Sequence, residues 1–245
     1  MQISKVAVIG SGTMGCGIAA QVANAGIPVS LLDLPSEEGL RNQIVEKAKE
    51  RIIKSRPPLL VEQKKIELLS VGNIEDHFAT VSEADWIVEA VVERIDIKKS
   101  IYKKINKFRK KNSIISSNTS TIPLKVLSED MSDEMKKSFC ITHFFNPVRY
   151  MGLLEIVKEP INDTEKINLL KSFCDEKLGK GVIICKDTPG FIGNRVGVYA
   201  IQVAMTEAFK MGLSIEEADA IFGRPMGIPK TGVFGLYDLI GLDLM

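Results

Sequence analysis

The chain has 245 residues, of which 45% are hydrophobic and 26% charged, and its formal net charge at pH 7 is +1. This composition is typical of a globular protein, and the charge balance gives no sign of the basic surface that nucleic-acid binding requires. No apolar run approaches the ~18 residues of a membrane span, and the N-terminus lacks a signal-peptide pattern. We therefore expect a cytoplasmic protein without nucleic-acid or membrane partners.

The cysteines also bear on the compartment. They show no C-x-x-C spacing and lie in apolar segments, at Cys16, Cys140, Cys174 and Cys185. This pattern is typical of buried reduced thiols, so we expect neither disulfides nor a metal site.

The N-terminal segment has the pattern strand, glycine-rich turn, helix. Residues 5–9 form a short β-branched run typical of a buried parallel strand, and apolar residues at helical spacing follow the turn. Between them, Gly10, Gly12 and Gly15 have the G-x-G-x-x-G spacing. A second apolar strand ends at Asp33, near the separation of about 20 residues expected for an acid that binds an adenosine ribose.

This arrangement predicts a dinucleotide-binding turn. Gly10 permits the tight turn, Gly12 lets a pyrophosphate approach the backbone, and Gly15 lets the helix pack close to the strand. The helix that begins at Thr13 and Met14 offers free N–H groups to the phosphates. Because a carboxylate repels a 2′-phosphate, Asp33 favours NAD over NADP. The alternative is a structural strand-turn-helix with a chance glycine pattern.

The next elements predict an alternation of strands and helices. We expect a charged helix over about 37–55, ended by a Pro-Pro pair, and a second helix over about 61–69. Helices are also expected from about 94 to 110 and from 164 to 177. Strands are expected at 84–91, 113–117, 138–143, 153–157 and 181–185. This order predicts an α/β fold, a Rossmann-type doubly wound sheet with a helical insertion.

The character changes near Thr188, after which only helices are expected. Asp187 or Thr188 would cap a helix of about 20 residues that starts at Pro189, and a capping box at 214–217 starts the next helix. The apolar faces of this part exceed what it can bury alone, so we expect a truncated all-α domain in a longer or associated chain. The expected domains are residues 1–188 and 189–245.

A dinucleotide domain needs a base to accept the substrate proton as hydride leaves, and histidine suits neutral pH. His77 lies in a polar loop and is expected at the surface, whereas His143 ends a strand, where ligands bind in open α/β sheets. Glu155 is embedded in an apolar strand and could orient His143. Ser120 and Asn194 could each hydrogen-bond a substrate oxygen or serve as capping and packing residues, and the pattern leaves both alternatives open.

Six motifs carry a family resemblance. They are GSGTMGCGIA, VVERIDIKKSIY, SSNTSTIP, THFFNPVRYMGLLEIV, LGKGVIICKDTPGFIGNR and GLYDLIGLD. Together they resemble the L-3-hydroxyacyl-CoA dehydrogenase family of fatty-acid β-oxidation, especially the dehydrogenase segment of its long bacterial multifunctional members. The resemblance covers essentially the whole chain and implies oxidation of L-3-hydroxyacyl-CoA to 3-ketoacyl-CoA with NAD.

The resemblance also implies residue roles. It makes His143 the catalytic base and Glu155 its partner, with Ser120 and Asn194 on the substrate's 3-oxygen. It further implies roles for Asn146 beside the catalytic pair, for Glu93 and Lys98 near the nicotinamide half of NAD, and for Lys47, Arg51 and Lys54 at coenzyme A.

The resemblance implies a homodimer or part of a longer multifunctional chain. Two other functions stay open at this point. One is a different NAD-dependent 3-hydroxyacid dehydrogenase of the type with a catalytic lysine, and the other is a non-catalytic NAD- or CoA-binding protein on the same fold.

Overall fold

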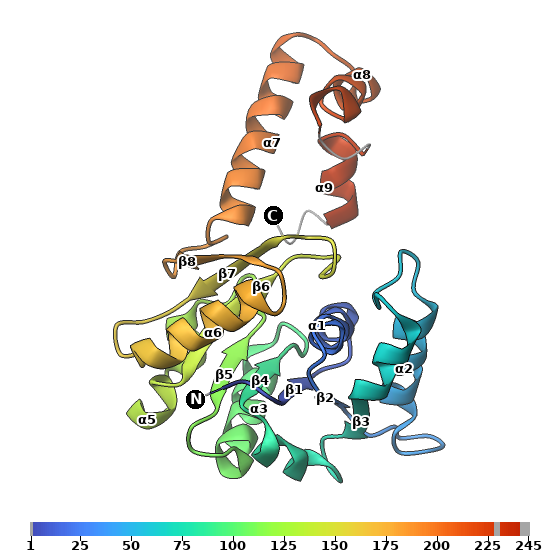
Figure 1. Cartoon of the computed structure of the whole chain (residues 1–245). Helices are drawn as coiled ribbons and strands as arrows, with labels where there is room; N and C mark the ends of the chain where they lie inside the picture. The colour runs from blue at the N-terminus through green and yellow to red at the C-terminus, as the bar shows by residue number, and fades with distance from the viewer. Residues whose placement is uncertain (1, 228–230, 241–245) are drawn as a thin grey trace. The chain divides into compact units, whose positions relative to one another are not determined.

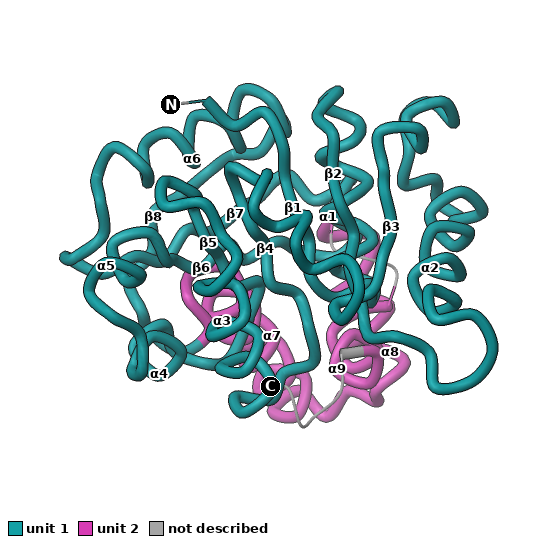
Figure 2. Tube along the Cα trace, turned by 90° about the horizontal axis from the view of Figure 1, so that it is seen from below, with its two compact units in different colours: residues 1–189 teal, residues 190–245 magenta. Residues whose placement is uncertain are grey.

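The computed structural model describes residues 2–227 and 231–240, the last of these by its backbone alone. The chain divides into two compact units, Met1–Pro189 and Gly190–Met245, drawn in teal and magenta in Figure 2. The last residues of the motif GLYDLIGLD, 241–243, lie outside the described residues.

The first unit is built on one sheet of eight strands in the order β3-β2-β1-β4-β5-β6-β7-β8 (Figure 1). The strands are β1 (Val6–Ile9), β2 (Val29–Asp33), β3 (Leu69–Asn73), β4 (Trp86–Glu89), β5 (Ile114–Ser117), β6 (Phe139–Phe144), β7 (Leu153–Val157) and β8 (Gly181–Cys185). Neighbouring strands are parallel except β6 and β7, which run antiparallel. The strand order reverses between β1 and β4, and open α/β sheets bind ligands at such a switch point.

Helices cover both faces of this sheet, which explains why its central strands are apolar along their whole length. Side chains of α1, α2 and α6 share one buried cluster with alternate residues of the strands, such as Val6, Val8 and Trp86. The intervening residues face α3, α4 and α5, as the contact between the Tyr102 and Phe139 rings indicates. The helices are α1 (Thr13–Asn24), α2 (Gln43–Lys54), α3 (Ile95–Phe108), α4 (Leu124–Ser128), α5 (Asp133–Lys136) and α6 (Thr164–Glu176).

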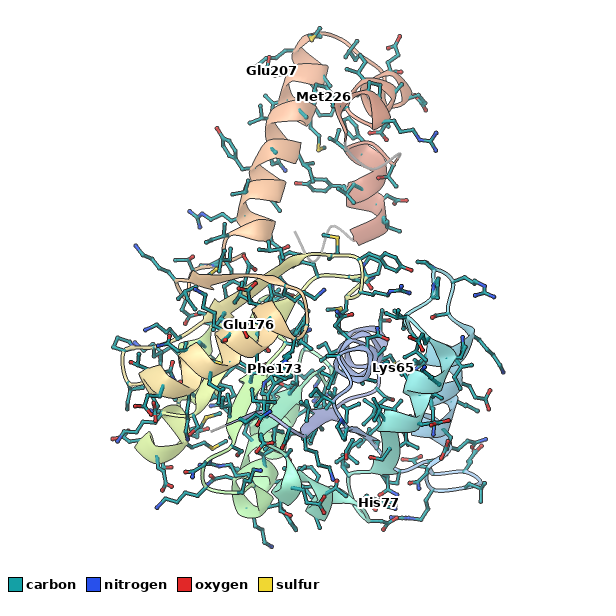
Figure 3. All side chains as sticks on the ribbon, viewed as in Figure 1. Lys65, His77, Phe173, Glu176, Glu207 and Met226 are labelled. Carbon is teal, nitrogen blue, oxygen red and sulfur yellow. The ribbon has the colours of Figure 1, made fainter. Side chains whose placement is uncertain are left out.

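Two local contacts stabilise this unit. Phe173, labelled in Figure 3, packs its ring edge-on against Trp86, with 5.9 Å between the ring centroids. Asp85, just before β4, accepts hydrogen bonds from the Ser4 amide at 2.8 Å and from Lys110 Nζ at 2.5 Å. Although burial opposes ionisation, the Lys110 ammonium and Ser4 hold the pKa of Asp85 below its ordinary value.

The insertion after β2 differs from the expected helix pair. The first helix begins only at Gln43, after turns over 37–42. The expected helix over 61–69 is a short 3₁₀ helix, η1 (Gln63–Leu68), and the chain then enters β3. The sequence analysis did not predict β3, because it is a short edge strand, half-exposed at its centre. Its pairing with β2 defines it, and that pairing lies far away in sequence.

The expected cap of the long C-terminal helix was also wrong. Asp187 accepts hydrogen bonds from the amides of Leu124 and Lys125, at 2.9 and 3.1 Å, and so caps α4. The long helix α7 (Gly193–Lys210) begins later, because Gly190 and Phe191 adopt left-handed backbone angles that a right-handed helix cannot include.

The second unit contains α7, α8 (Ile215–Ile221), the 3₁₀ helix η3 (Arg224–Met226) and α9 (Phe234–Ile240). Its buried cluster is small and comprises Ile201, Ala204, Val233 and Tyr237. The Ser214–Glu217 capping box is present as expected. Tyr199 on α7 is 71% exposed and Val196 62%. Figure 3 labels Glu207 and Met226 in this unit. Across the residues that the structure describes, no helix is long and apolar enough to cross a membrane.

Candidate functional site

The glycine-rich turn lies at the carboxyl end of β1, and two of its glycines are sterically required. A Cβ on Gly10, whose φ is +101°, would lie 2.4 Å from the Ala90 carbonyl oxygen. A Cβ on Gly15 would lie 1.8 Å from the Gly10 carbonyl oxygen. Gly12 differs, because no atom apart from those of its neighbours along the chain lies within 4 Å of its would-be Cβ. The open space at Gly12 is what the approach of a ligand requires.

A cavity of about 430 Å³ opens beside this turn. The turn itself lines it from Gly10 to Met14, together with Asp33, the 90–92 segment after β4, and Ile97 and Ile101 of α3. The first amides of α1, which have no partner inside the helix, begin at this cavity wall. Apolar walls, helix amides and one carboxylate suit the adenine, pyrophosphate and ribose of a dinucleotide, so these residues fit NAD.

Asp33 ends β2 at the rim of this cavity. Its Oδ2 atom accepts hydrogen bonds from the Ser11 amide, at 2.6 Å, and from the Ser11 hydroxyl. Its Oδ1 atom accepts one from the Leu34 amide at 2.7 Å. These contacts hold the carboxylate in one orientation at the expected end of the strand.

His143 and Glu155 face each other across the antiparallel pair β6–β7. They stand directly opposite in register, and His143 Nδ1 lies 2.7 Å from Glu155 Oε2. The His143 side chain is 6% exposed and that of Glu155 is fully buried. In a neutral imidazole, a carboxylate at Nδ1 assigns the ring proton to that nitrogen, and Nε2 then carries the lone pair. This arrangement can accept a proton at Nε2 and stabilise the resulting positive charge.

Cys185 on β8 is a further neighbour of Glu155. Its Sγ atom lies 3.8 Å from Glu155 Oε1. Burial, together with the nearby carboxylate, raises the pKa of Cys185 to about 11, so the thiol is protonated near neutral pH. The four cysteines are free and buried, as the sequence predicts. Among the described residues, no group of three or more His, Cys, Asp or Glu side chains could hold a metal ion.

Ser120 lies in the loop after β5, between two threonines that bind the same carboxylate. Thr119 and Thr121 both donate hydroxyl hydrogen bonds to Glu93 Oε1, the second at 2.9 Å. Burial opposes ionisation of Glu93, but the Lys98 ammonium holds its pKa below the ordinary value. Glu93 therefore holds the loop through the residues on either side of Ser120.

The same loop is also attached to the strand of His143. Asn118 Oδ1, two residues before Ser120, accepts a hydrogen bond from the Phe144 amide at 3.1 Å. This bond joins the carboxyl ends of β5 and β6, so the backbone beside His143 and the Ser120 loop are held together.

Glu93 and Lys98 belong to a buried network whose central residue, Glu89, the sequence analysis missed. Lys98 Nζ lies 2.8 Å from Glu89 Oε1 and 3.1 Å from Glu93 Oε2. Glu89 also accepts hydrogen bonds from Tyr102 at 2.6 Å and Ser117 at 2.7 Å, and both Glu89 and Lys98 are buried. Burial and the Glu89 charge raise the pKa of Tyr102. The available signal was an acid, Glu89, inside the apolar strand expected at 84–91.

The three basic residues of α2 that the resemblance places at coenzyme A have different surroundings. Lys47 is exposed, and Lys54 forms an exposed ion pair with Glu50 at 3.0 Å. Arg51 instead donates a hydrogen bond from Nη2 to the Ser11 carbonyl oxygen at 2.8 Å, in the glycine-rich turn. A role for these residues at coenzyme A stays a prediction.

The remaining candidates lie in three places. Asn146 is exposed in the loop after β6. Asn194 lies in the first turn of α7, in the second unit. His77, labelled in Figure 3, is half-buried, and its Nδ1 accepts a hydrogen bond from the Asn73 amide at 3.2 Å. His77 thus supports a turn near β3, outside the His143 site. The catalytic or binding roles of Asn146 and Asn194 stay predictions.

Comparison with known proteins decides the family. Residues 5–188 match the family described as "3-hydroxyacyl-CoA dehydrogenase, NAD binding domain", and residues 190–245 match its C-terminal domain. The chain belongs to the 3-hydroxyacyl-CoA dehydrogenase family. This assignment confirms the resemblance inferred from the motifs, the fold class and the expectation of NAD as cofactor.

Relatives in this family align with almost the whole of this chain. The mitochondrial hydroxyacyl-coenzyme A dehydrogenase of Sus scrofa is 34% identical over 98% of this chain and 77% of its own length. The structure of (S)-3-hydroxybutyryl-CoA dehydrogenase from Ralstonia eutropha has a TM-score of 0.81 and 30% identity, covering 99% of this chain and 84% of that one.

The chain is also similar to part of a much longer relative. A Rickettsia felis protein named as a fatty acid oxidation complex trifunctional enzyme is 44% identical over the whole of this chain. The chain spans only 34% of that relative's length.

Proposed function

We propose that this chain carries out the NAD-dependent oxidation of an L-3-hydroxyacyl-CoA to the 3-ketoacyl-CoA. The observation that carries the proposal is the buried 2.7 Å contact between His143 and Glu155 at the carboxyl edge of the sheet. Family membership supports it, since relatives of which this chain covers 77% and 84% bear the name of this activity.

In this mechanism, His143 Nε2 takes the proton of the substrate's 3-hydroxyl group as the carbon–oxygen single bond becomes a carbonyl. Bound NAD supplies the acceptor for the hydride that leaves C3. Glu155 keeps the Nδ1 proton in place and stabilises the imidazolium that forms. The proton is then released to solvent, and the products are the ketone and NADH.

Other residues would position the reactants. The turn at Gly10, Gly12, Thr13, Met14 and Gly15 would hold the pyrophosphate, and Asp33 the adenosine ribose. Glu93 and Lys98 would lie near the nicotinamide half. We assign Ser120, Asn146 and Asn194 to the substrate's 3-oxygen or its surroundings.

We also infer a cytoplasmic protein that acts as a homodimer or within a longer chain, with residues 189–245 contributing to the substrate site and the subunit contact. The exposed apolar side chains of α7 support association, and the R. felis relative supports a multifunctional chain. Lys47 and Lys54 of α2 are candidates for the phosphates of coenzyme A, since both are cationic and exposed.

The test is NADH formation, followed by absorbance, with (S)-3-hydroxybutyryl-CoA and with longer 3-hydroxyacyl-CoA substrates. We expect turnover that depends on NAD and on the S configuration. Binding of NAD without turnover on any of these substrates, by a folded protein in its native assembly, would favour the non-catalytic alternative. Turnover on free 3-hydroxyacids instead would favour the other dehydrogenase class.

A further inference from the structure

Arg51 contacts the glycine-rich turn from a helix that lies outside the strand-turn-helix unit. Its guanidinium Nη2 donates to the Ser11 carbonyl oxygen at 2.8 Å, across 40 positions of sequence. The Cys16 thiol donates to the same oxygen at 3.1 Å. The Ser11 amide and hydroxyl bind Asp33, so the backbone of Ser11 is held at both its N–H and its C=O.

We propose that Arg51 is a positioning residue for the NAD pyrophosphate, acting through the Ser11–Gly12 peptide. This inference rests on the family's NAD site and adds a residue to it. A trans peptide is planar, and its C=O and N–H point in opposite directions. By holding the Ser11 carbonyl, Arg51 orients the Gly12 N–H, and Gly12 lines the cavity with open space in front of it.

Charge acts in the same direction. Asp33, a carboxylate, binds one side of Ser11, and its negative charge opposes a pyrophosphate. Arg51 places a permanent positive charge on the other side of the same residue, which offsets that repulsion. Helix dipole and guanidinium therefore both favour an anion at the turn.

The helix that carries Arg51 is packed in the core, which supports the contact of Arg51 with the Ser11 carbonyl oxygen. Val45, Ala48 and Ile52 bury the inner face of the helix in the core shared with α1. Arg51 is itself exposed, but it directly precedes the buried Ile52, so its backbone is held by a helix packed in the core. Lys49 lies on the same helix with the same charge and is partly exposed, which makes it a matched control.

The experiment is isothermal titration calorimetry, which measures the Kd of the full chain, in its native assembly, for NAD, ADP and adenosine. Adenosine lacks the pyrophosphate that the turn would hold. In Arg51→Ala we expect the Kd for NAD and for ADP to rise about tenfold, or about 1.4 kcal/mol. The Kd for adenosine should stay within about twofold. Arg51→Lys should lie between the wild type and Arg51→Ala, and Lys49→Ala should match the wild type.

Because binding is measured directly, the result does not depend on turnover. Unchanged NAD and ADP affinity in Arg51→Ala would overturn the proposal. Equal weakening of all three ligands would also overturn it, because Arg51 would then shape the whole site. An unchanged NAD affinity with a raised KM for acyl-CoA would instead assign Arg51 to coenzyme A. Thermal unfolding of each variant checks that the fold is intact, and Arg51→Lys serves as the test if Arg51→Ala does not fold.

Discussion

Replacing Glu155 with glutamine would test the proposed catalytic pair most directly. The change keeps the size of a buried side chain on β7 but removes the negative charge 2.7 Å from His143 Nδ1. A hydrogen bond to a charged group contributes about 1.5–3 kcal/mol, and here it would strengthen as the imidazole becomes cationic. At about 1.36 kcal/mol per decade, we expect kcat to fall about 10- to 150-fold.

The assay is NADH formation at saturating NAD and (S)-3-hydroxybutyryl-CoA, with the Kd for NAD measured in parallel. His143→Gln should lose about 10²–10⁴-fold in kcat, the usual range for a positioned general base. The double variant should be little slower than His143→Gln, because the two residues act as a unit. Glu176→Gln, an exposed change on α6, is the control and should match the wild type.

Two results would refute this reasoning. If Glu155→Gln stays within about twofold of the wild type while remaining folded, the carboxylate does not orient the base. If the losses of the two single variants multiply in the double variant, the residues act independently. Near-normal turnover of His143→Gln would place the base elsewhere.

Three further predictions concern the cofactor and stability. Asp33→Ala should reduce the preference for NAD over NADP, measured as the ratio of their Kd values; a wild type that binds both equally would contradict the NAD assignment. Lys98→Met leaves the Glu89 carboxylate buried without its cation, so the free energy of unfolding in urea should fall by about 3–5 kcal/mol, and a loss under about 1 kcal/mol would contradict this. Because Lys110 and Ser4 lower the pKa of Asp85, its stabilising effect is present above the ordinary pKa of about 4 and lost as pH falls through the folded value. The difference in unfolding free energy between wild type and Asp85→Asn should therefore be constant above about pH 5 and close in stronger acid, and a difference that grows in acid would reverse this reasoning.

Local pattern was sufficient for much of the fold and for the main site residues. Buried strands are largely apolar runs, so every strand of the sheet except β3 was visible in the sequence. The turn was readable because Gly10 and Gly15 stand where any side chain would collide with the backbone. His143 stood out as a histidine near a strand end, and Glu155 as an acid in an apolar strand, because such residues are rarely buried without a partner.

Tertiary pairing decided the rest. β3 is a strand because it pairs with β2 at the edge of the sheet. Asp187 caps α4 because the fold places it beside amides that lie more than 60 positions away in the sequence. Arg51 and Ser11 are 40 positions apart, and local periodicity cannot predict a contact between residues so far apart in the sequence.

The sequence by itself determined which segments are buried and which backbone positions must be glycine, because burial periodicity and steric limits act within a few residues. Only the tertiary structure decided which polar groups meet. Glu89 and Lys98 illustrate this, since each alone is a charged side chain that would cost free energy in the core, and together they form a buried ion pair. Two polar groups form a hydrogen bond when they lie close in space, and their separation along the chain says little about that distance.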